Sequence, residues 1–280
     1  MHAQNFKTNI TAGTIFSQSF ATKANARTIS SSRYAYGVRA TRYRKNGSRA
    51  KAVPGPDRSK LALLNTLVRL LPDKAEPYYN RGTMLLELGE IHNAISDFAQ
   101  AIAVDGSFAL AYSNRGSALN LIGRYYEAIV DFDCAIKLDP RLPHPLYGRA
   151  QAYLRLAQYQ KAIDGFSDYI KICPNDPIPY VERGKAYYHH ARNDEAATDY
   201  SMAIELDPNF VEAYACRALL HANAGNYVAA VDDLTKAISL DKNYPPAYVL
   251  RSALYRELGN TQWIEDRKRA LELDSNLNLW

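Results

Sequence analysis

Acidic residues are missing from the beginning of this chain. The first 56 of its 280 residues contain ten lysines and arginines but no aspartate or glutamate. The rest of the chain holds the other 24 basic residues and all 29 acidic ones. The overall net charge of +5 therefore combines a strongly basic beginning with a mildly acidic remainder.

Cysteine and long apolar runs are also scarce. Cys134, Cys173 and Cys216 lie far apart, no Cys-x-x-Cys occurs, and no Cys/His cluster has the spacing of a zinc site. Such scattered thiols indicate a reducing compartment or simply core positions. No apolar run approaches the roughly 18 residues that a membrane-spanning helix needs. We therefore expect no transmembrane segment.

Catalytic signatures are absent as well. The sequence has no Gly-rich phosphate loop, no Gly-x-Ser-x-Gly and no His-Glu-x-x-His. His189 and His190 are adjacent, so on a helix they point in different directions and make a poor pair of metal ligands. We expect a protein that is not an enzyme, with no cofactor, no metal and no small-molecule substrate.

Residues 1–56 are rich in Ser, Thr, Ala and Arg. Such a segment cannot bury enough apolar surface to offset its ordering entropy, so we expect it to be disordered. An acid-free, Arg- and Ser-rich composition is typical of an organelle transit peptide, and the apolar stretch of a secretory signal is missing. "VRAT", at residues 38–41, resembles a chloroplast stromal processing site. We predict a location in the chloroplast stroma, with the mitochondrial matrix as the alternative.

A nucleic-acid-binding arm is the rival interpretation of the same segment. Cations and aromatics alternate there, as in single-strand binders: Arg33, Tyr34, Arg39, Arg42, Tyr43, Arg44 and Lys45. Binding to phosphates does not require the exclusion of every acid from so long a segment, so we favour the transit peptide.

A pattern of six arginines with a constant spacing of 34 residues runs through the rest of the chain. They are Arg81, Arg115, Arg149, Arg183, Arg217 and Arg251. A small residue follows each of them: Gly82, Gly116, Ala150, Gly184, Ala218 and Ser252. Further on, an alanine recurs at Ala94, Ala128, Ala162, Ala196 and Ala230, and a large residue at Phe98, Phe132, Phe166, Tyr200 and Leu234.

This pattern resembles the tetratricopeptide repeat (TPR) family, whose 34-residue unit is a helix–turn–helix. The resemblance covers about residues 75–274 and implies an all-α, right-handed TPR solenoid of about six repeats behind the disordered presequence. The predicted parts are a basic transit peptide or linker (1–56), a capping helix (57–74), six repeats (75–108, 109–142, 143–176, 177–210, 211–244 and 245–276) and a tail (277–280).

The local chemistry supports such a fold. Small residues at the Gly82 and Ala94 positions allow two helices to approach closely, and the ring at the Phe98 position fills the space beside them. Glycines between the helices suit a turn with positive φ: Gly89, Gly123, Gly225 and Gly259. Proline after the second helix ends it, because proline cannot continue a helix.

An acid follows most of the arginines at a constant spacing, at Asp97, Asp131, Asp199 and Asp233. We expect Arg–Asp pairs that join the two helices, since buried charges are paired. The alternative is a ladder of arginines that binds phosphate or carboxylate. Repeat three has Gly165 at the acid position, so Arg149 either borrows Asp131 or is available to a ligand.

The ends of the array depart from the pattern. The segment at 57–72 matches a second helix without its first, which predicts a cap on repeat one; a docking helix for a partner is the alternative. The last unit is one residue short, and its polar outer face suits a helix with no successor. Trp280, in the tail, either folds back or contacts a partner.

The TPR resemblance implies that positions two, five, nine, twelve and thirteen of each first helix line a concave groove. The predicted partner-binding residues are Tyr147, Gln151, Arg155, Lys185, Tyr188 and His189. Their mixed, modestly basic character predicts an extended or helical partner segment with some acidic character.

The clamp with which TPR co-chaperones hold the acidic tails of Hsp70 or Hsp90 needs Lys and Asn at defined positions. This chain has Tyr79, Thr83, Asn114, His144 and Gly148 there, and only Asn114 matches. We therefore do not expect binding of those tails.

We predict a non-catalytic protein–protein interaction scaffold. The chain resembles chloroplast-targeted TPR scaffold and assembly proteins, which implies a role in assembling a plastid complex or in plastid biogenesis. One alternative is an organellar RNA-associated factor, against which the acidic charge of residues 57–280 argues. Another is a cytosolic or nuclear TPR adaptor with a basic tail.

Overall fold

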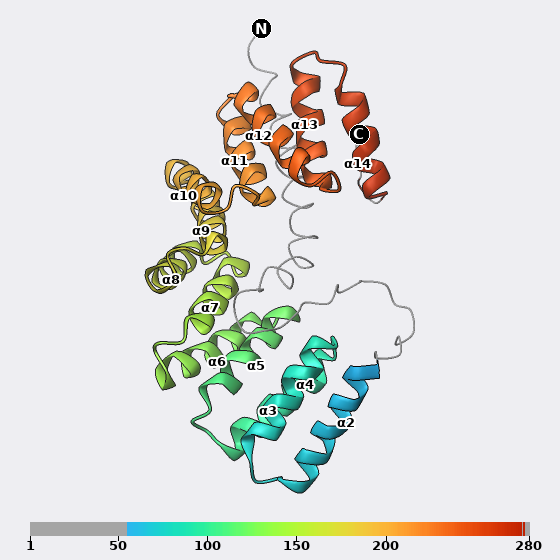
Figure 1. Ribbon diagram of the computed structural model, residues 1–280. Coiled ribbons are helices and arrows are strands. Elements are labelled where there is room, and N and C mark those ends of the chain that lie inside the picture. Colours follow the sequence, from blue (N-terminus) through green and yellow to red (C-terminus); the bar gives the residue numbers. More distant parts are fainter. Residues whose placement is uncertain (1–54, 276, 278–280) are drawn as a thin grey trace. The chain divides into compact units, whose positions relative to one another are not determined.

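The computed structural model describes residues 55–275 and residue 277, with side chains from residue 59 onward. Residues 1–54 of the predicted presequence and most of the C-terminal tail, including Trp280, lie outside the described residues. Within them the chain is helical, with no strand (Figure 1). The expected all-α fold class is confirmed for this part of the chain.

The helices follow one another in pairs, one pair for each 34-residue repeat. The first helices are α3 (Ala75–Glu87), α5 (Ala109–Leu121), α7 (Pro143–Arg155), α9 (Pro177–His189), α11 (Val211–Asn223) and α13 (Pro245–Glu257). The second helices are α4 (Ile91–Val104), α6 (Tyr125–Leu138), α8 (Tyr159–Ile172), α10 (Asn193–Leu206), α12 (Tyr227–Leu240) and α14 (Trp263–Leu273). None of the described helices is both long and apolar enough to span a membrane.

The described helices form two compact units, one with α2–α8 (residues 55–174) and one with α9–α14 (residues 175–277). Inside each unit every helix packs against the next, and the first helices of neighbouring repeats also touch. Each repeat therefore buries its apolar surface against its neighbours, as a solenoid requires.

The small residues of the repeat lie where the rings of the second helices need space. A Cβ atom added at Gly116 would stand 2.9 Å from Cε1 of Phe132, and one at Gly184 would stand 2.5 Å from Cε1 of Tyr200. Phe132 is completely buried, and Tyr200 is 2% exposed. The predicted role of the glycine and aromatic positions is confirmed at these contacts.

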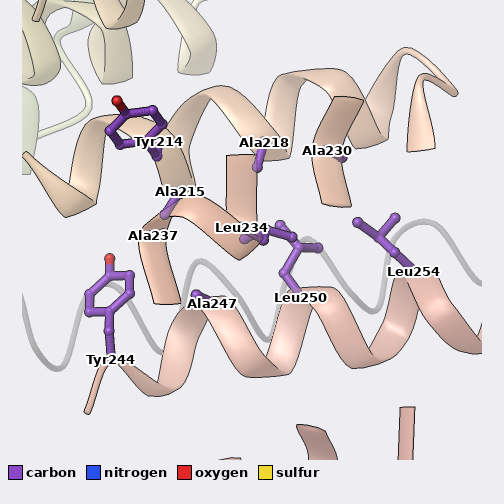
Figure 2. Close-up of a cluster of buried hydrophobic side chains, with 10 residues drawn as sticks. All are labelled: Tyr214, Ala215, Ala218, Ala230, Leu234, Ala237, Tyr244, Ala247, Leu250 and Leu254. Atoms are coloured by element: carbon purple, nitrogen blue, oxygen red, sulfur yellow. The ribbon is translucent and has the colours of Figure 1, made fainter. Parts of the chain in front are cut away.

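Figure 2 shows the corresponding core of the unit that contains α9–α14. Alanines and Leu234 from α11 and α12 meet Leu250 and Leu254 from α13. Tyr214 and Tyr244 close one end of the cluster. Because alanine is so frequent here, the helices come close together and leucine fills the remaining space.

The turns between paired helices have a left-handed residue in each repeat. The predicted glycines have positive φ, from 68° at Gly259 to 80° at Gly89. Repeats three and four place alanine there instead: Ala157 has φ 56° and Ala191 has φ 59°. An L-amino acid is strained in this region. The alanines therefore disfavour these two turns, and the packing of the flanking helices imposes the conformation.

Helix α2 (Gly55–Leu70) precedes the first repeat and packs against α3. It begins two residues before the expected capping helix and ends four residues before its expected end. Leu64 is buried, whereas Leu63 and Leu70 are 59% and 69% exposed. The helix therefore covers repeat one with one face and leaves apolar side chains exposed on another.

Candidate functional site

The repeat arginines bind carboxylates of the second helix in their own repeat. In Arg81, Nε donates to Oδ2 of Asp97 at 2.6 Å and Nη2 donates to Oδ1 at 2.7 Å. The same two-point contact joins Arg115 to Asp131, Arg183 to Asp199 and Arg217 to Asp233. The predicted Arg–Asp pairing is confirmed in these four repeats.

In these pairs the positive charge of each arginine is balanced by a carboxylate inside the fold. The carboxylates are buried, and the hydrogen bond to Asp131 raises the pKa of Arg115 further above its ordinary value. Burial raises the pKa of the Asp199 carboxyl, an effect that Arg183 partly opposes. A ladder of free arginines for anions is therefore not present in these repeats.

A fifth pair joins Arg251 to Asp266, with Nε to Oδ2 at 2.7 Å and Nη2 to Oδ1 at 2.8 Å. The sequence interpretation missed it because the two residues are 15 apart and not 16. The sequence did contain a sign of this pair: the last unit is one residue short before its second helix, which moves the acid one residue closer to the arginine.

The arginines have further contacts that the sequence analysis did not predict. The remaining terminal nitrogen, Nη1, reaches back 16 residues to the preceding second helix, to Asn65 from Arg81, Ser201 from Arg217 and Thr235 from Arg251. The guanidinium groups also lie 5.6–5.9 Å from the tyrosine rings three residues before them, as in Arg217 with Tyr214. The arginine thus joins three helices.

Repeat three is different. Leu146 stands at the position where the other repeats have a tyrosine. Gly165 stands at the position of the aspartate that pairs with the arginine in the other repeats. Nη1 of Arg149 donates to Oδ1 of Asp133, on α6, at 2.5 Å. Of the two alternatives for Arg149, the pairing with Asp131 is not formed, and both oxygens of that carboxylate bind Arg115.

Within each unit the first helices share a surface that we call the first-helix face, made of positions two, five, nine, twelve and thirteen with the neighbouring position six. In the unit of α2–α8, uncharged polar groups connect adjacent repeats across it. Nδ2 of Asn114 donates to the Tyr79 hydroxyl at 3.2 Å, and Oγ of Ser117 lies 3.0 Å from Nε2 of His144. Nδ2 of Asn120 donates to the carbonyl oxygen of Gly148 at 2.9 Å.

Three of the predicted binding residues lie on α7. Nε2 of Gln151 donates to the hydroxyl of Tyr147 at 3.0 Å. The ring of Tyr147 is half-buried against Phe166 and Tyr169, with centroids 5.6 and 5.4 Å away. Arg155 is exposed at the end of the helix and forms no ion pair within the described part of the chain. This trio combines an aromatic surface with an amide and an accessible cation.

The other three predicted residues lie on α9, in the second unit. Nζ of Lys185 lies 2.8 Å from Oε1 of Glu182 and 2.7 Å from Oε1 of Glu212. Burial opposes the charged lysine, but the two carboxylates outweigh it and raise its pKa above the ordinary value. The expectation of a basic surface was wrong at this position, because two carboxylates offset one ammonium group.

Tyr188 and His189 complete the second trio. The Tyr188 hydroxyl accepts a hydrogen bond from Nδ2 of Asn223 at 2.9 Å, and its ring lies 5.4 Å from that of His189. Desolvation and the nearby charge of Lys185 lower the pKa of His189, so its ring is neutral at pH 7. The six predicted residues are thus divided between the two units, three on α7 and three on α9. No cluster of His, Cys, Asp and Glu in the described residues is suited to hold a metal ion.

The repeats agree with a known family. Tetratricopeptide repeat models match residues 75–108, 109–142, 146–176 and 200–232. The chain is a tetratricopeptide repeat protein. The 34-residue period that the family models match is also the period of the helix pairs in the structure.

Solved TPR structures resemble the chain in fold. The Cut9–Hcn1 hetero-tetramer of APC/C matches with a TM-score of 0.65 and 19% identity, over 78% of this chain and 44% of that one. A TPR protein from Parabacteroides merdae matches with a TM-score of 0.65 and 20% identity, over 79% and 88%. YrrB, described as a TPR protein with an unusual peptide-binding site, matches with a TM-score of 0.56 and 22% identity, over 66% and 95%.

This chain spans less than half the length of the matched APC/C chain. No curated protein sequence matches the chain. At such low sequence identities the matched structures establish the fold alone.

Proposed function

We propose that this TPR protein is a non-catalytic scaffold that binds a protein partner on its first-helix face. Proteins of this fold generally act in protein–protein interaction. The observation that carries the proposal is the contrast between two sets of polar groups. Most repeat arginines are occupied by internal carboxylates, whereas the first-helix face keeps half-exposed aromatic, amide and hydroxyl groups. Tyrosine rings such as that of Tyr147 are among the usual anchors of interfaces, and the amide and hydroxyl groups beside them can add hydrogen bonds.

The charges and hydrogen-bonding groups of the first helices limit the kind of partner segment that could bind there. Lys185 is held by two carboxylates and His189 is neutral, so α9 offers aromatic and hydrogen-bonding contacts and no net positive charge. Arg155 on α7 is an exposed cation. We propose a largely uncharged extended or helical segment that lies along the first-helix face of the unit of α2–α8, with at most one acid opposite Arg155.

A double variant, Gln151→Ala with Arg155→Ala, tests this proposal. Both side chains project from α7 without entering its core, so the melting temperature should stay nearly unchanged. Affinity capture from an extract of the source organelle should recover a partner with the parent protein and lose it with the double variant. Arg141→Ala removes a more exposed cation, 93% accessible, just before α7 and is the matched control. Equal partner binding by the double variant and the control would contradict the proposal.

We also propose that the protein works in a plastid, as an assembly or biogenesis factor, with the mitochondrial matrix as the alternative site. The support is the composition of residues 1–56, which is acid-free and rich in Arg and Ser. A fluorescent reporter fused to these residues should enter chloroplasts and lose the segment. A reporter that stays in the cytosol or enters the nucleus would instead support an adaptor with a basic tail.

A further inference from the structure

Repeat three keeps its arginine but lacks two of the side chains that surround the arginine in most of the other repeats. Leu146 replaces the tyrosine that precedes the arginine, and Gly165 replaces the carboxylate. Five other arginines place the Nε–Nη2 edge of the guanidinium against an Asp of their own second helix. In Arg149 that edge has no acceptor from α8.

The geometry of Arg149 leaves this edge unsatisfied. Its ion pair with Asp133 uses Nη1, and Nε is buried with no hydrogen-bond partner. A guanidinium group presents its donors as a rigid fork that matches the two oxygens of a carboxylate. Within the described residues the fork of Arg149 therefore has a hydrogen-bond acceptor at Nη1 only.

Asp133 supplies a charge but not the missing contact. Its side chain is 51% exposed, whereas the carboxylates of the regular pairs are at most 10% exposed. In repeats one, five and six the residue that Nη1 reaches is neutral, namely Asn65, Ser201 or Thr235. Asp133 thus occupies the outer position of the pattern, and no carboxylate among the described residues occupies the inner one, where Nε is buried without an acceptor.

We infer that the Nε–Nη2 edge of Arg149 receives a carboxylate from a partner protein, an Asp or Glu side chain that takes the position of the internal aspartate. The contact lies between α7 and α8, outside the first-helix face, and therefore goes beyond the function proposed above. The buried Nε gains its missing acceptor in this contact.

The test uses the full chain and nuclear magnetic resonance of the arginine Nε–Hε groups. The probe is a short, end-blocked alanine peptide with one central Asp, compared at constant ionic strength with its Asn counterpart and with inorganic phosphate. The Asp peptide should shift the Arg149 signal in a saturable way and leave the five paired arginines unchanged. Asp133→Asn removes a neighbouring charge of the same sign as the probe and should tighten the binding several-fold.

A matched control variant places a carboxylate at position 165 of the chain itself, beside Arg149. A Cβ at Gly165 would stand 2.9 Å from the Cβ of Ala150, so Gly165→Asp is combined with Ala150→Gly to recreate the Gly184 and Asp199 arrangement. This variant should no longer respond to the peptide. The inference is wrong if the parent Arg149 signal does not respond to the Asp peptide, if the Asn peptide or phosphate shifts it as much, or if the folded double variant responds equally.

Discussion

Gly148 lies against the ring of Phe132, a residue of the preceding repeat. A Cβ at position 148 would stand 2.4 Å from Cζ of that ring, closer than any other glycine contact in the described repeats. Gly116, from the same repeat as Phe132, touches the ring as well. One buried phenylalanine is therefore enclosed by glycines of two repeats, which couples the packing inside a repeat to the packing between repeats.

Gly148→Ala should lower the free energy of unfolding by about 1–3 kcal/mol, because the added methyl group overpacks the core against Phe132. Thermal or urea denaturation measures this. Phe132→Leu should recover part of the loss in the double variant, since Leu234 and Leu250 share a core at the equivalent positions. Gly106→Ala is the control, with its nearest neighbouring atom 4.0 Å away. Equal melting temperatures for Gly148→Ala and the control would contradict this account.

Asp131→Asn should destabilise the first unit by about 2–4 kcal/mol, because it leaves the guanidinium of Arg115 without its buried carboxylate. The loss is moderated by the 24% exposure of the arginine side chain. Urea denaturation should show a lower midpoint. Glu127→Gln removes the exposed ion pair with Arg124 and should have no measurable effect. A similar midpoint for both variants would mean that the internal pair contributes no more than a surface one.

Ala157→Gly and Ala191→Gly should each stabilise the protein, by about 0.5–1 kcal/mol, because glycine adopts positive φ without strain. Differential scanning calorimetry would show a raised melting temperature. The reverse change, Gly89→Ala, should lower it by a similar amount. At Gly89 no atom lies within 4 Å of an added Cβ, so the backbone conformation alone decides the result. A loss of stability in both alanine-to-glycine variants would show that backbone entropy outweighs the strain.

His144 should make the stability of the first unit pH-dependent. Burial lowers its pKa below the ordinary 6.5, so the folded protein favours the neutral ring. Below about pH 6.5 the unfolded chain binds this proton before the folded one does, and the free energy of unfolding falls as pH is lowered. The slope is at most about 1.4 kcal/mol per pH unit. Urea denaturation at about pH 7.5 and about pH 5.5 measures it.

His144→Gln keeps a polar partner for Ser117 but does not titrate. Other histidines and carboxylates contribute equally to both proteins, so the difference between parent and variant isolates His144. A constant stability difference between the two pH values would show that the imidazole is as easily protonated in the folded protein as in the unfolded chain.

The sequence by itself determined the helix pairs, their 34-residue period and the Arg–Asp contacts of four repeats. It could do so because the two partners keep a constant spacing inside one unit of the repeat, where helix geometry fixes their distance. The positive φ of four turn glycines and the fit of small residues against large rings followed from the same local rules.

Tertiary structure decided the contacts between repeats. The period says nothing of which carboxylate Arg149 finds when Gly165 interrupts the pattern, and Asp133 is its partner because α6 lies beside α7. Lys185 looks like a free cation in the sequence, but packing of α9 against α11 brings Glu212 to it, 27 residues away. Such pairs depend on how neighbouring helices are rotated and spaced. That geometry is set by the side chains packed between them, and the repeat pattern does not encode it.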